Sequence, residues 1–156
     1  MSITFKGNLT EHFTQIEYHK KGDANITRDA LIFADCLEDF RVWLRRKMIV
    51  HAWFRTLKEN RAAGGISSSN HLKGCACDFH IANITIDRAR FIKYATKWAQ
   101  ICKAHGKTGE AGLYAWGVHF GIQNADQEHR NNYKFYHWDS RTGDQINKPF
   151  AELNLL

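Results

Sequence analysis

A histidine and an aspartate separated by a glycine are the residues of this sequence best suited to chemistry. His71, Gly74 and Asp78 lie in the stretch SNHLKGCACD, where the glycine permits a tight backbone turn that most residues resist. Such a turn brings an imidazole and a carboxylate together, and both groups are good zinc ligands. On spacing alone a second interpretation stays open, in which a loop histidine and a strand-start aspartate cap turn amides.

The elements that position these residues are predicted from hydrophobic periodicity. Helices are expected over residues 27–47, with Thr27 as N-cap, and over residues 86–105. Strands are expected over 48–55, 75–84, 113–123 and 133–139, with polar loops over 56–70 and 124–132. This order predicts an α+β fold with helices packed on one face of a mostly antiparallel sheet.

The stretch from Ser69 to Asp78 resembles a family signature. Its pattern, Ser-x-His-x-x-Gly-x-Ala-x-Asp, is that of the D-Ala-D-Ala carboxypeptidase and L-alanyl-D-glutamate endopeptidase family of zinc peptidases. The preceding segment is also similar to the family, with Trp53-Phe54-Arg55 followed by Asn60, Gly64-Gly65 and Ser67. The resemblance covers residues 27–140 and implies one domain over residues 1–156 with the hedgehog-type fold that these peptidases share.

The resemblance also implies one Zn²⁺ ion held by His71, Asp78 and a later histidine. His119, in GLYAWGVHF, resembles the family's third ligand in context and distance, and His137, in YHWDSR, is the alternative. If residues 113–123 and 133–139 form an antiparallel hairpin with its turn near Glu128, the two histidines are directly opposed and share a face. His137 would then contact substrate or intermediate, whereas a one-residue slip would separate the two histidines.

A catalytic zinc site keeps one position for water, whose proton a nearby base accepts. The family places an acidic residue close to its third histidine, and the positions around His119 carry none. Asp139 is the preferred candidate for this base, and Glu110 is another. The resemblance further implies that Arg55 holds a substrate carboxylate through its two-pronged guanidinium, with Ser69 also at the substrate site.

The length of 156 residues is typical of a single domain. The chain has a net charge of +6, and 13% of its residues are aromatic. The N-terminal stretch MSITFKGNLTEHF has no apolar core of signal-peptide length, and no apolar run is long enough to span a membrane. We therefore expect synthesis in the cytoplasm, without membrane insertion. Action at the cell wall would follow release, as in the bacteriophage or prophage lysis enzymes that the chain resembles. The chain is expected to be a monomer.

The leading hypothesis is a zinc metallopeptidase that cuts peptidoglycan stem peptides, as an endopeptidase or a carboxypeptidase. A zinc-stabilised binding domain with weak or no catalysis is the alternative. Nucleic acid is not an expected partner, because the basic runs Lys20-Lys21 and Arg45-Arg46-Lys47 are short and the second fits a solvated helix end. The four cysteines include no CxxC pair, so a four-cysteine zinc site is not expected.

Overall fold

A six-stranded mixed sheet organises the protein, whose computed structural model describes residues 7–21 and 26–156. The strand order is β1-β2-β4-β3-β5-β6, and every pairing is antiparallel except the one between β3 and β5. The strands are β1 (Met48–Ala52), β2 (Ala76–Ile81), β3 (Gly109–Tyr114), β4 (Gly117–Ile122), β5 (Tyr136–Asp139) and β6 (Ile146–Asn147). The predicted α+β fold is confirmed.

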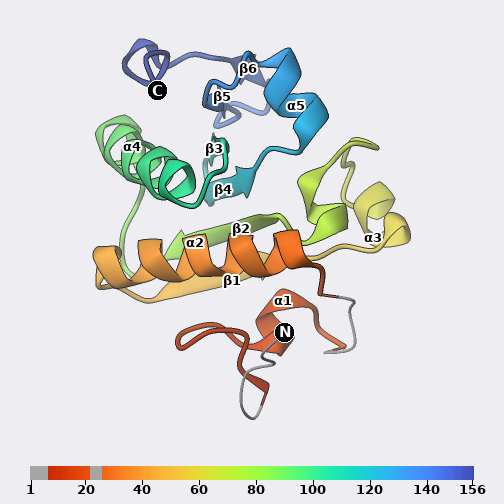
Figure 1. The fold of residues 1–156 in the computed structure, drawn as a ribbon. Coiled ribbons are helices and arrows are strands. Elements are labelled where there is room, and N and C mark those ends of the chain that lie inside the picture. Colours follow the sequence, from red (N-terminus) through yellow and green to blue (C-terminus); the bar gives the residue numbers. More distant parts are fainter. Residues whose placement is uncertain (1–6, 22–25) are drawn as a thin grey trace.

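Two long helices, α2 (Arg28–Leu44) and α4 (Arg88–Ala104), pack on one face of this sheet (Figure 1). The shorter helices are α1 (Gln15–Tyr18), α3 (Leu57–Ala62), α5 (Ala125–Arg130) and the 3₁₀ helices η2 (Asn70–Lys73) and η3 (Ala151–Leu153). Thr27 caps α2 as expected, and Asp87 caps α4 through a hydrogen bond from the backbone N–H of Arg90. Both long helices lie within the predicted ranges.

Aromatic rings between the helices and the sheet form the centre of the core. Phe120 on β4 stacks on Trp98 of α4, with ring centroids 4.8 Å apart, and meets Phe40 of α2 edge-on at 4.9 Å. Phe79 on β2 joins the same cluster, and all four rings are fully buried. Each buried phenylalanine contributes about 1.5–3 kcal/mol of transfer free energy, so this layer fixes which face of β2 and β4 turns away from the helices.

The predicted hairpin between residues 113–123 and 133–139 is wrong. Residues 109–122 themselves form a hairpin, β3–β4, which turns at Ala115 and Trp116. Strand β5 then pairs in parallel with β3, so β3 separates β4 from β5. The sequence does not predict this turn, because its residues are apolar and continue the strand pattern on both sides.

Two short helices lie where polar loops were predicted. Each begins with a capping box, Thr56 with Glu59 for α3 and Asn124 with Gln127 for α5, in which each side chain accepts a hydrogen bond from the other residue's backbone N–H. Helix α5 contributes Gln127 and Arg130 to the pocket described below, and the segment that follows α3 lines its other side.

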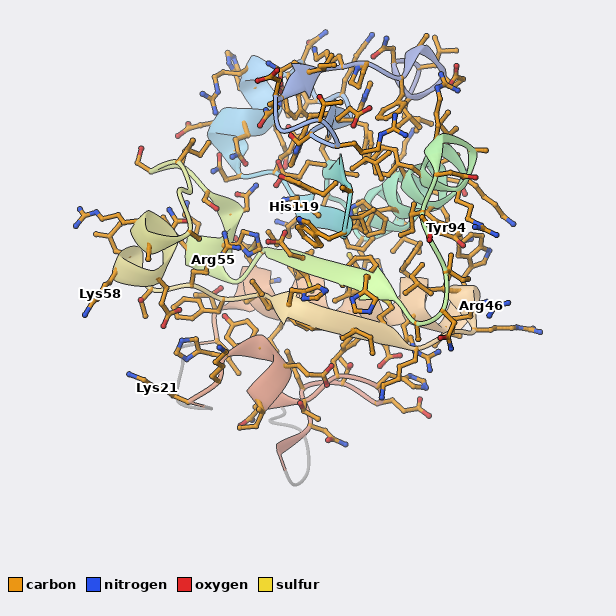
Figure 2. The ribbon with its side chains drawn as sticks, turned by 180° about the vertical axis from the view of Figure 1, so that it is seen from behind. Lys21, Arg46, Arg55, Lys58, Tyr94 and His119 are labelled. Atoms are coloured by element: carbon orange, nitrogen blue, oxygen red, sulfur yellow. The ribbon has the colours of Figure 1, made fainter. Side chains whose placement is uncertain are left out.

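Residues 1–6, within the stretch for which no signal peptide was expected, lie outside the described residues. Among residues 7–21 and 26–156, no helix combines the length and apolar character that crossing a bilayer requires. Arg46 lies on the opposite side of the molecule from Lys21 and Lys58 (Figure 2), so these three basic side chains do not gather on one patch.

Candidate metal centre

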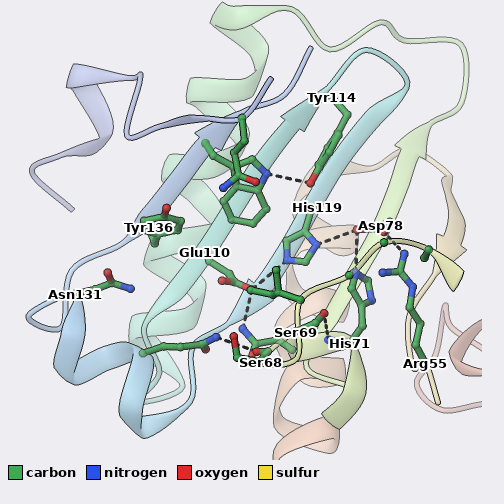
Figure 3. Close-up of a pocket in the computed structure, with 18 of the residues that line it drawn as sticks. Arg55, Ser68, Ser69, His71, Asp78, Glu110, Tyr114, His119, Asn131 and Tyr136 are labelled. Carbon is green, nitrogen blue, oxygen red and sulfur yellow. Dashed lines mark hydrogen bonds and ion pairs between the residues drawn. The ribbon is translucent and has the colours of Figure 1, made fainter. Parts of the chain in front are cut away.

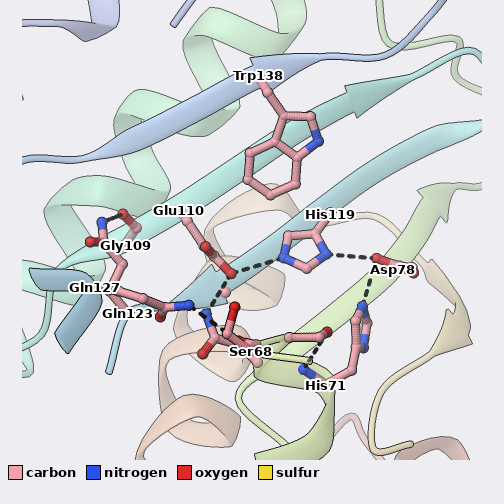
Figure 4. A network of polar contacts seen from close by, with 12 residues as sticks. Ser68, His71, Asp78, Gly109, Glu110, His119, Gln123, Gln127 and Trp138 are labelled. Atoms are coloured by element: carbon pink, nitrogen blue, oxygen red, sulfur yellow. Dashed lines mark hydrogen bonds and ion pairs between the residues drawn. The ribbon is translucent and has the colours of Figure 1, made fainter. Parts of the chain in front are cut away.

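Three side chains from separate elements converge on the sheet face that the helices leave open (Figure 4). His71 comes from η2, Asp78 from β2 and His119 from β4. Oδ1 of Asp78 lies 3.1 Å from Nε2 of His71 and 2.9 Å from Nδ1 of His119. One ligand atom from each residue lies within 4.8 Å of the others, and all three residues are buried.

Local structure explains this convergence. Asp78 and His119 are directly opposed in the antiparallel β2–β4 ladder, so their side chains share a face. The chain reverses between η2 and β2 at Gly74, whose φ of +69° is a left-handed conformation that glycine adopts without strain. The indole of Trp53 donates to the Gly74 carbonyl at 2.9 Å, which fixes this turn against the end of β1.

Hydrogen bonding around His71 determines which of its nitrogens can bind a metal. Nδ1 donates to the backbone carbonyl of Trp53 at 2.6 Å, so Nε2 is the nitrogen that faces Asp78. In neutral His71 this Nε2 carries a lone pair, and the Asp78 carboxylate carries another. Two acceptors at this distance require either an extra proton or a shared cation between them.

His119 likewise has fewer protons than its hydrogen-bond acceptors require. Its Nδ1 faces Asp78 and its Nε2 lies 3.0 Å from Oε1 of Glu110, so a carboxylate lies at each ring nitrogen. A neutral imidazole donates only one proton and therefore satisfies only one of the two. One divalent cation among His71, Asp78 and His119 replaces both missing protons, and two imidazoles with a carboxylate are a ligand set that Zn²⁺ accepts.

Asp78 is held as an anion by its surroundings. Burial alone would raise the pKa of its carboxyl, but the hydrogen bonds from His119 and His71 outweigh this and hold that pKa well below its usual range. The second carboxylate oxygen, Oδ2, accepts a hydrogen bond from Nη2 of Arg55 at 2.9 Å. Arg55 therefore leaves Oδ1 as the oxygen that faces the two histidines.

Glu110 on β3 completes the polar network. Its Oε1 contacts His119 and accepts a 2.7 Å hydrogen bond from Nδ2 of Asn70. Burial lowers the pKa of His119, but the hydrogen bonds to Asp78 and Glu110 raise it to about 9. A Cβ atom at Gly121, opposite Glu110 in the ladder, would lie 2.5 Å from Oε1, so the glycine leaves the space that this carboxylate occupies.

A pocket of about 680 Å³ opens over the three converging residues (Figure 3). One side is formed by Arg55 and the segment from Ala63 to His71, and α5 contributes Gln127 and Arg130. Aromatic side chains line the sheet side, where Trp138 packs 5.0 Å from the ring of His119. This volume lies within the range typical of ligand-binding pockets, about 300–1,000 Å³.

Ser69 lies at this pocket, as expected of a substrate-site residue, but its hydroxyl has a structural partner. It is the N-cap of η2, and its Oγ accepts a 3.3 Å hydrogen bond from the backbone N–H of His71. Ser69 therefore helps to fix the backbone that carries His71.

His137 and Asp139 do not lie in the pocket, contrary to expectation. Side chains alternate along β5, and Trp138 between them faces His119. His137 is fully buried on the other face, packed against Phe150 and hydrogen-bonded through Nε2 to Asn154 at 2.9 Å. Because β5 pairs with β3 rather than β4, His137 is not opposite His119.

Asp139, the preferred candidate for the base, has a local partner of its own. Both carboxylate oxygens of Asp139 accept hydrogen bonds from the Arg141 guanidinium, at 3.0 and 2.7 Å. These hydrogen bonds lower the pKa of the Asp139 carboxyl, and burial opposes them. The expectation that Asp139 reaches a metal-bound water is therefore not supported by its position.

His80, two residues beyond Asp78 on β2, contacts a histidine of the neighbouring strand. Its Nδ1 lies 2.6 Å from Nε2 of His51 on β1. Asn70, Tyr114 and Trp138 were not singled out in the sequence, although all three line the pocket. The position of Asn70, beside His71 in the signature stretch, was the one available signal.

Comparison with protein families gives one match. The family model described as peptidase M15 matches residues 9–120, more than two thirds of the chain. No curated protein and no solved structure matches the chain. The matched range includes His71, Asp78, His119 and Glu110, and it ends before His137. Family match and converging side chains agree, and the chain belongs to the peptidase M15 family.

Proposed function

We propose that this protein is a zinc-dependent metallopeptidase that hydrolyses peptide bonds in the stem peptides of bacterial peptidoglycan. The observation that carries the proposal is the approach of His71, Asp78 and His119 around one point at the base of a peptide-sized pocket. Membership of a peptidase family supports hydrolysis. The resemblance of the stretch Ser69–Asp78 to peptidoglycan peptidases supports the substrate class.

In this proposal His71 and Asp78 bind zinc through Nε2 and Oδ1, with His119 as third ligand through Nδ1. When bound, Zn²⁺ polarises the scissile carbonyl and lowers the pKa of a coordinated water towards about 7. The opposite nitrogens of the two histidines are fixed by hydrogen bonds to the Trp53 carbonyl and to Glu110. Such partners set the tautomer and orientation of ligating imidazoles.

Glu110 replaces Asp139 as the candidate general base. Among the described residues, Asp78 and Glu110 are the acidic side chains that line the pocket. Both oxygens of Asp78 are engaged by His71, His119 and Arg55. Oε2 of Glu110 accepts no hydrogen bond within the described part of the chain, so this oxygen is available to take a proton from water and to pass it to the leaving amine.

Arg55 has two roles in this proposal. One arm of the guanidinium holds Oδ2 of Asp78, and Arg55 also lines the pocket, where its remaining N–H groups can donate to a substrate carboxylate or carbonyl. Ser69 supports the site through the η2 backbone and borders the substrate. We further propose that residues 1–156 act as one monomeric domain, released to the cell wall in phage or prophage lysis.

Cleavage of purified peptidoglycan, together with metal analysis of the same samples, tests the proposal. The wild type should contain about one zinc per chain and release new amino groups or free D-alanine from the wall. His71→Ala and His119→Ala should lose both metal and activity, whereas His137→Ala should retain the metal. Zinc with wall binding but no cleavage would indicate the non-catalytic binding domain instead, and zinc retained in His119→Ala would refute this ligand set.

A further inference from the structure

Four rings that the proposed mechanism does not use lie beside the pocket on the open face of the sheet. We call them the aromatic rim: His51 on β1, His80 on β2, and Tyr114 and Trp116 at the β3–β4 turn. Tyr114 and Trp116 stack with centroids 5.0 Å apart and planes 21° apart. The ring of Trp116 meets His51 at 5.3 Å and 71°, and His51 lies 4.8 Å from His80.

Backbone features bring these rings together. His80 is two residues beyond Asp78 on β2 and therefore faces the same side of the sheet. The β1–β2 ladder shifts register between Val50 and Ala52, which places a bulge at His51. Bulges are frequent beside active sites, where they redirect a side chain, and this one allows His51 to reach His80 at 2.6 Å between ring nitrogens.

The rim exposes a large apolar ring together with polar nitrogens. Trp116 is 47% exposed, although an indole is among the most favourable side chains to bury. No hydrogen bond within residues 7–21 and 26–156 uses the second ring nitrogen of His51 or of His80. An apolar peptide side chain on this surface would leave those nitrogens unpaired, which is unfavourable. A pyranose, with C–H groups on its face and hydroxyl groups at its edge, satisfies both the ring and the nitrogens.

The aromatic rim is continuous with the pocket. Tyr114 and Trp116 line the pocket as well as the rim. The hydroxyl of Tyr114 accepts a 3.0 Å hydrogen bond from the indole of Trp138, and Trp138 packs on His119. A row of rings thus leads from the proposed metal ligand to exposed Trp116. A ligand that follows this row has one part at the metal site and another part outside the pocket.

We propose that the aromatic rim binds the glycan strand of the wall, with an N-acetylated sugar on Trp116, while the attached peptide enters the pocket. This inference rests on the proposed function and specifies its substrate as peptide still joined to sugar. The sugar contact adds binding energy outside the reacting bond, so we expect a stem peptide that carries its disaccharide to be cleaved with a lower KM than the same peptide alone.

Two matched substrates test the inference: one stem peptide with its N-acetylated disaccharide and the same peptide without it. The wild type should prefer the first by about tenfold in kcat/KM, which corresponds to about 1.4 kcal/mol. In Trp116→Ala this preference should fall to about one, and in His51→Ala it should fall in part. Tyr133→Ala is the control, since Tyr133 is 65% exposed and lies outside both pocket and rim.

A direct binding measurement keeps this inference separate from the proposed function. An oligomer of N-acetylglucosamine, titrated into wild type without peptide, should change the tryptophan fluorescence, and Trp116→Ala should abolish the change. Equal cleavage of both substrates by the wild type, or an unchanged preference in Trp116→Ala, would overturn the rim proposal. If the wild type cleaves neither substrate, the proposed function fails, and the oligosaccharide titration still decides whether the rim binds sugar.

Discussion

Arg55 and Asp78 form an ion pair at 2.9 Å inside the pocket, and only one oxygen of the aspartate takes part. The other oxygen faces both histidines. In the proposed metal site, this division leaves Asp78 a single oxygen for the ion and anchors the guanidinium that we expect to meet the substrate. We therefore expect Arg55, whose sequence context resembles that of a substrate-binding arginine, to support the proposed metal site as well.

Replacement of this arginine should weaken metal binding. In Arg55→Ala, Oδ2 of Asp78 loses its partner and the carboxylate is free to rotate, so zinc affinity should fall by about 10–100-fold, the usual effect of losing such a support. Competition with a chromogenic chelator measures the affinity. Arg61→Ala on α3, outside the pocket, is the control, and equal affinities in the two variants would contradict the support role.

Replacement of Glu110 by glutamine should separate catalysis from metal binding. Glutamine keeps an oxygen that can accept from His119 but cannot take a proton, so kcat should fall by about 10²–10⁴-fold, the range for loss of a general base. Zinc content should remain near that of the wild type. Metal analysis and peptide cleavage on the same preparation give both values. A fully active Glu110→Gln variant would show that another residue acts as the general base.

Bound zinc should stabilise the folded chain. A ligand at 100 times its Kd adds about 2.7 kcal/mol, which for a domain of this size raises Tm by about 5–10 °C. Thermal unfolding with zinc and with excess chelator measures this difference. In His119→Ala the Tm should change little on addition of zinc. His137→Ala should have a lower Tm than the wild type but should keep the increase in Tm with zinc.

Acid should destabilise the protein partly through His137. Burial lowers its pKa, and hydrogen bonding to Asn154 opposes this, so the folded-state pKa lies below the unfolded value of 6.5. The folded state therefore disfavours the charged imidazole, and the stability from the neutral form, complete above pH 6.5, is lost as pH falls below it. Urea unfolding at pH 7.5 and 5.5 should show a smaller loss in His137→Gln than in wild type.

Exposed His129 on α5 provides the matched control for that experiment. His129→Gln makes the same chemical change on the surface and should leave the loss of stability on acidification as it is in the wild type. An identical loss in the wild type and in His137→Gln would show that His137 is not responsible.

Local sequence patterns predicted the two long helices and the signature stretch because their information lies within a few residues. Thr27 and Asp87 cap the helices, and Gly74 permits the turn that separates His71 from Asp78. The approach of His119 to Asp78 depends on pairing between β2 and β4, and no local pattern encodes that pairing. Its prediction came from the family resemblance.

The position of Glu110 beside His119 is not predicted by local sequence patterns. Glu110 reaches His119 because β3 and β4 form a hairpin, whose turn at Ala115 and Trp116 has none of the usual turn residues. Without that turn, the sequence pattern pairs residues 133–139 with the wrong strand and places Asp139 and His137 on the wrong face of the sheet. A single unrecognised turn thus accounts for both misplaced residues.

The bridge that Trp53 makes between the end of β1 and the turn before β2 has a consequence for assembly. Its carbonyl orients His71 and its indole holds Gly74, so His71, a proposed ligand, is in position only when this turn has docked. His119, the proposed third ligand, comes beside Asp78 only when β2 and β4 have paired. An ion that requires both histidines can bind only after β2 and β4 have paired. Metal uptake should therefore follow folding of the chain rather than start it.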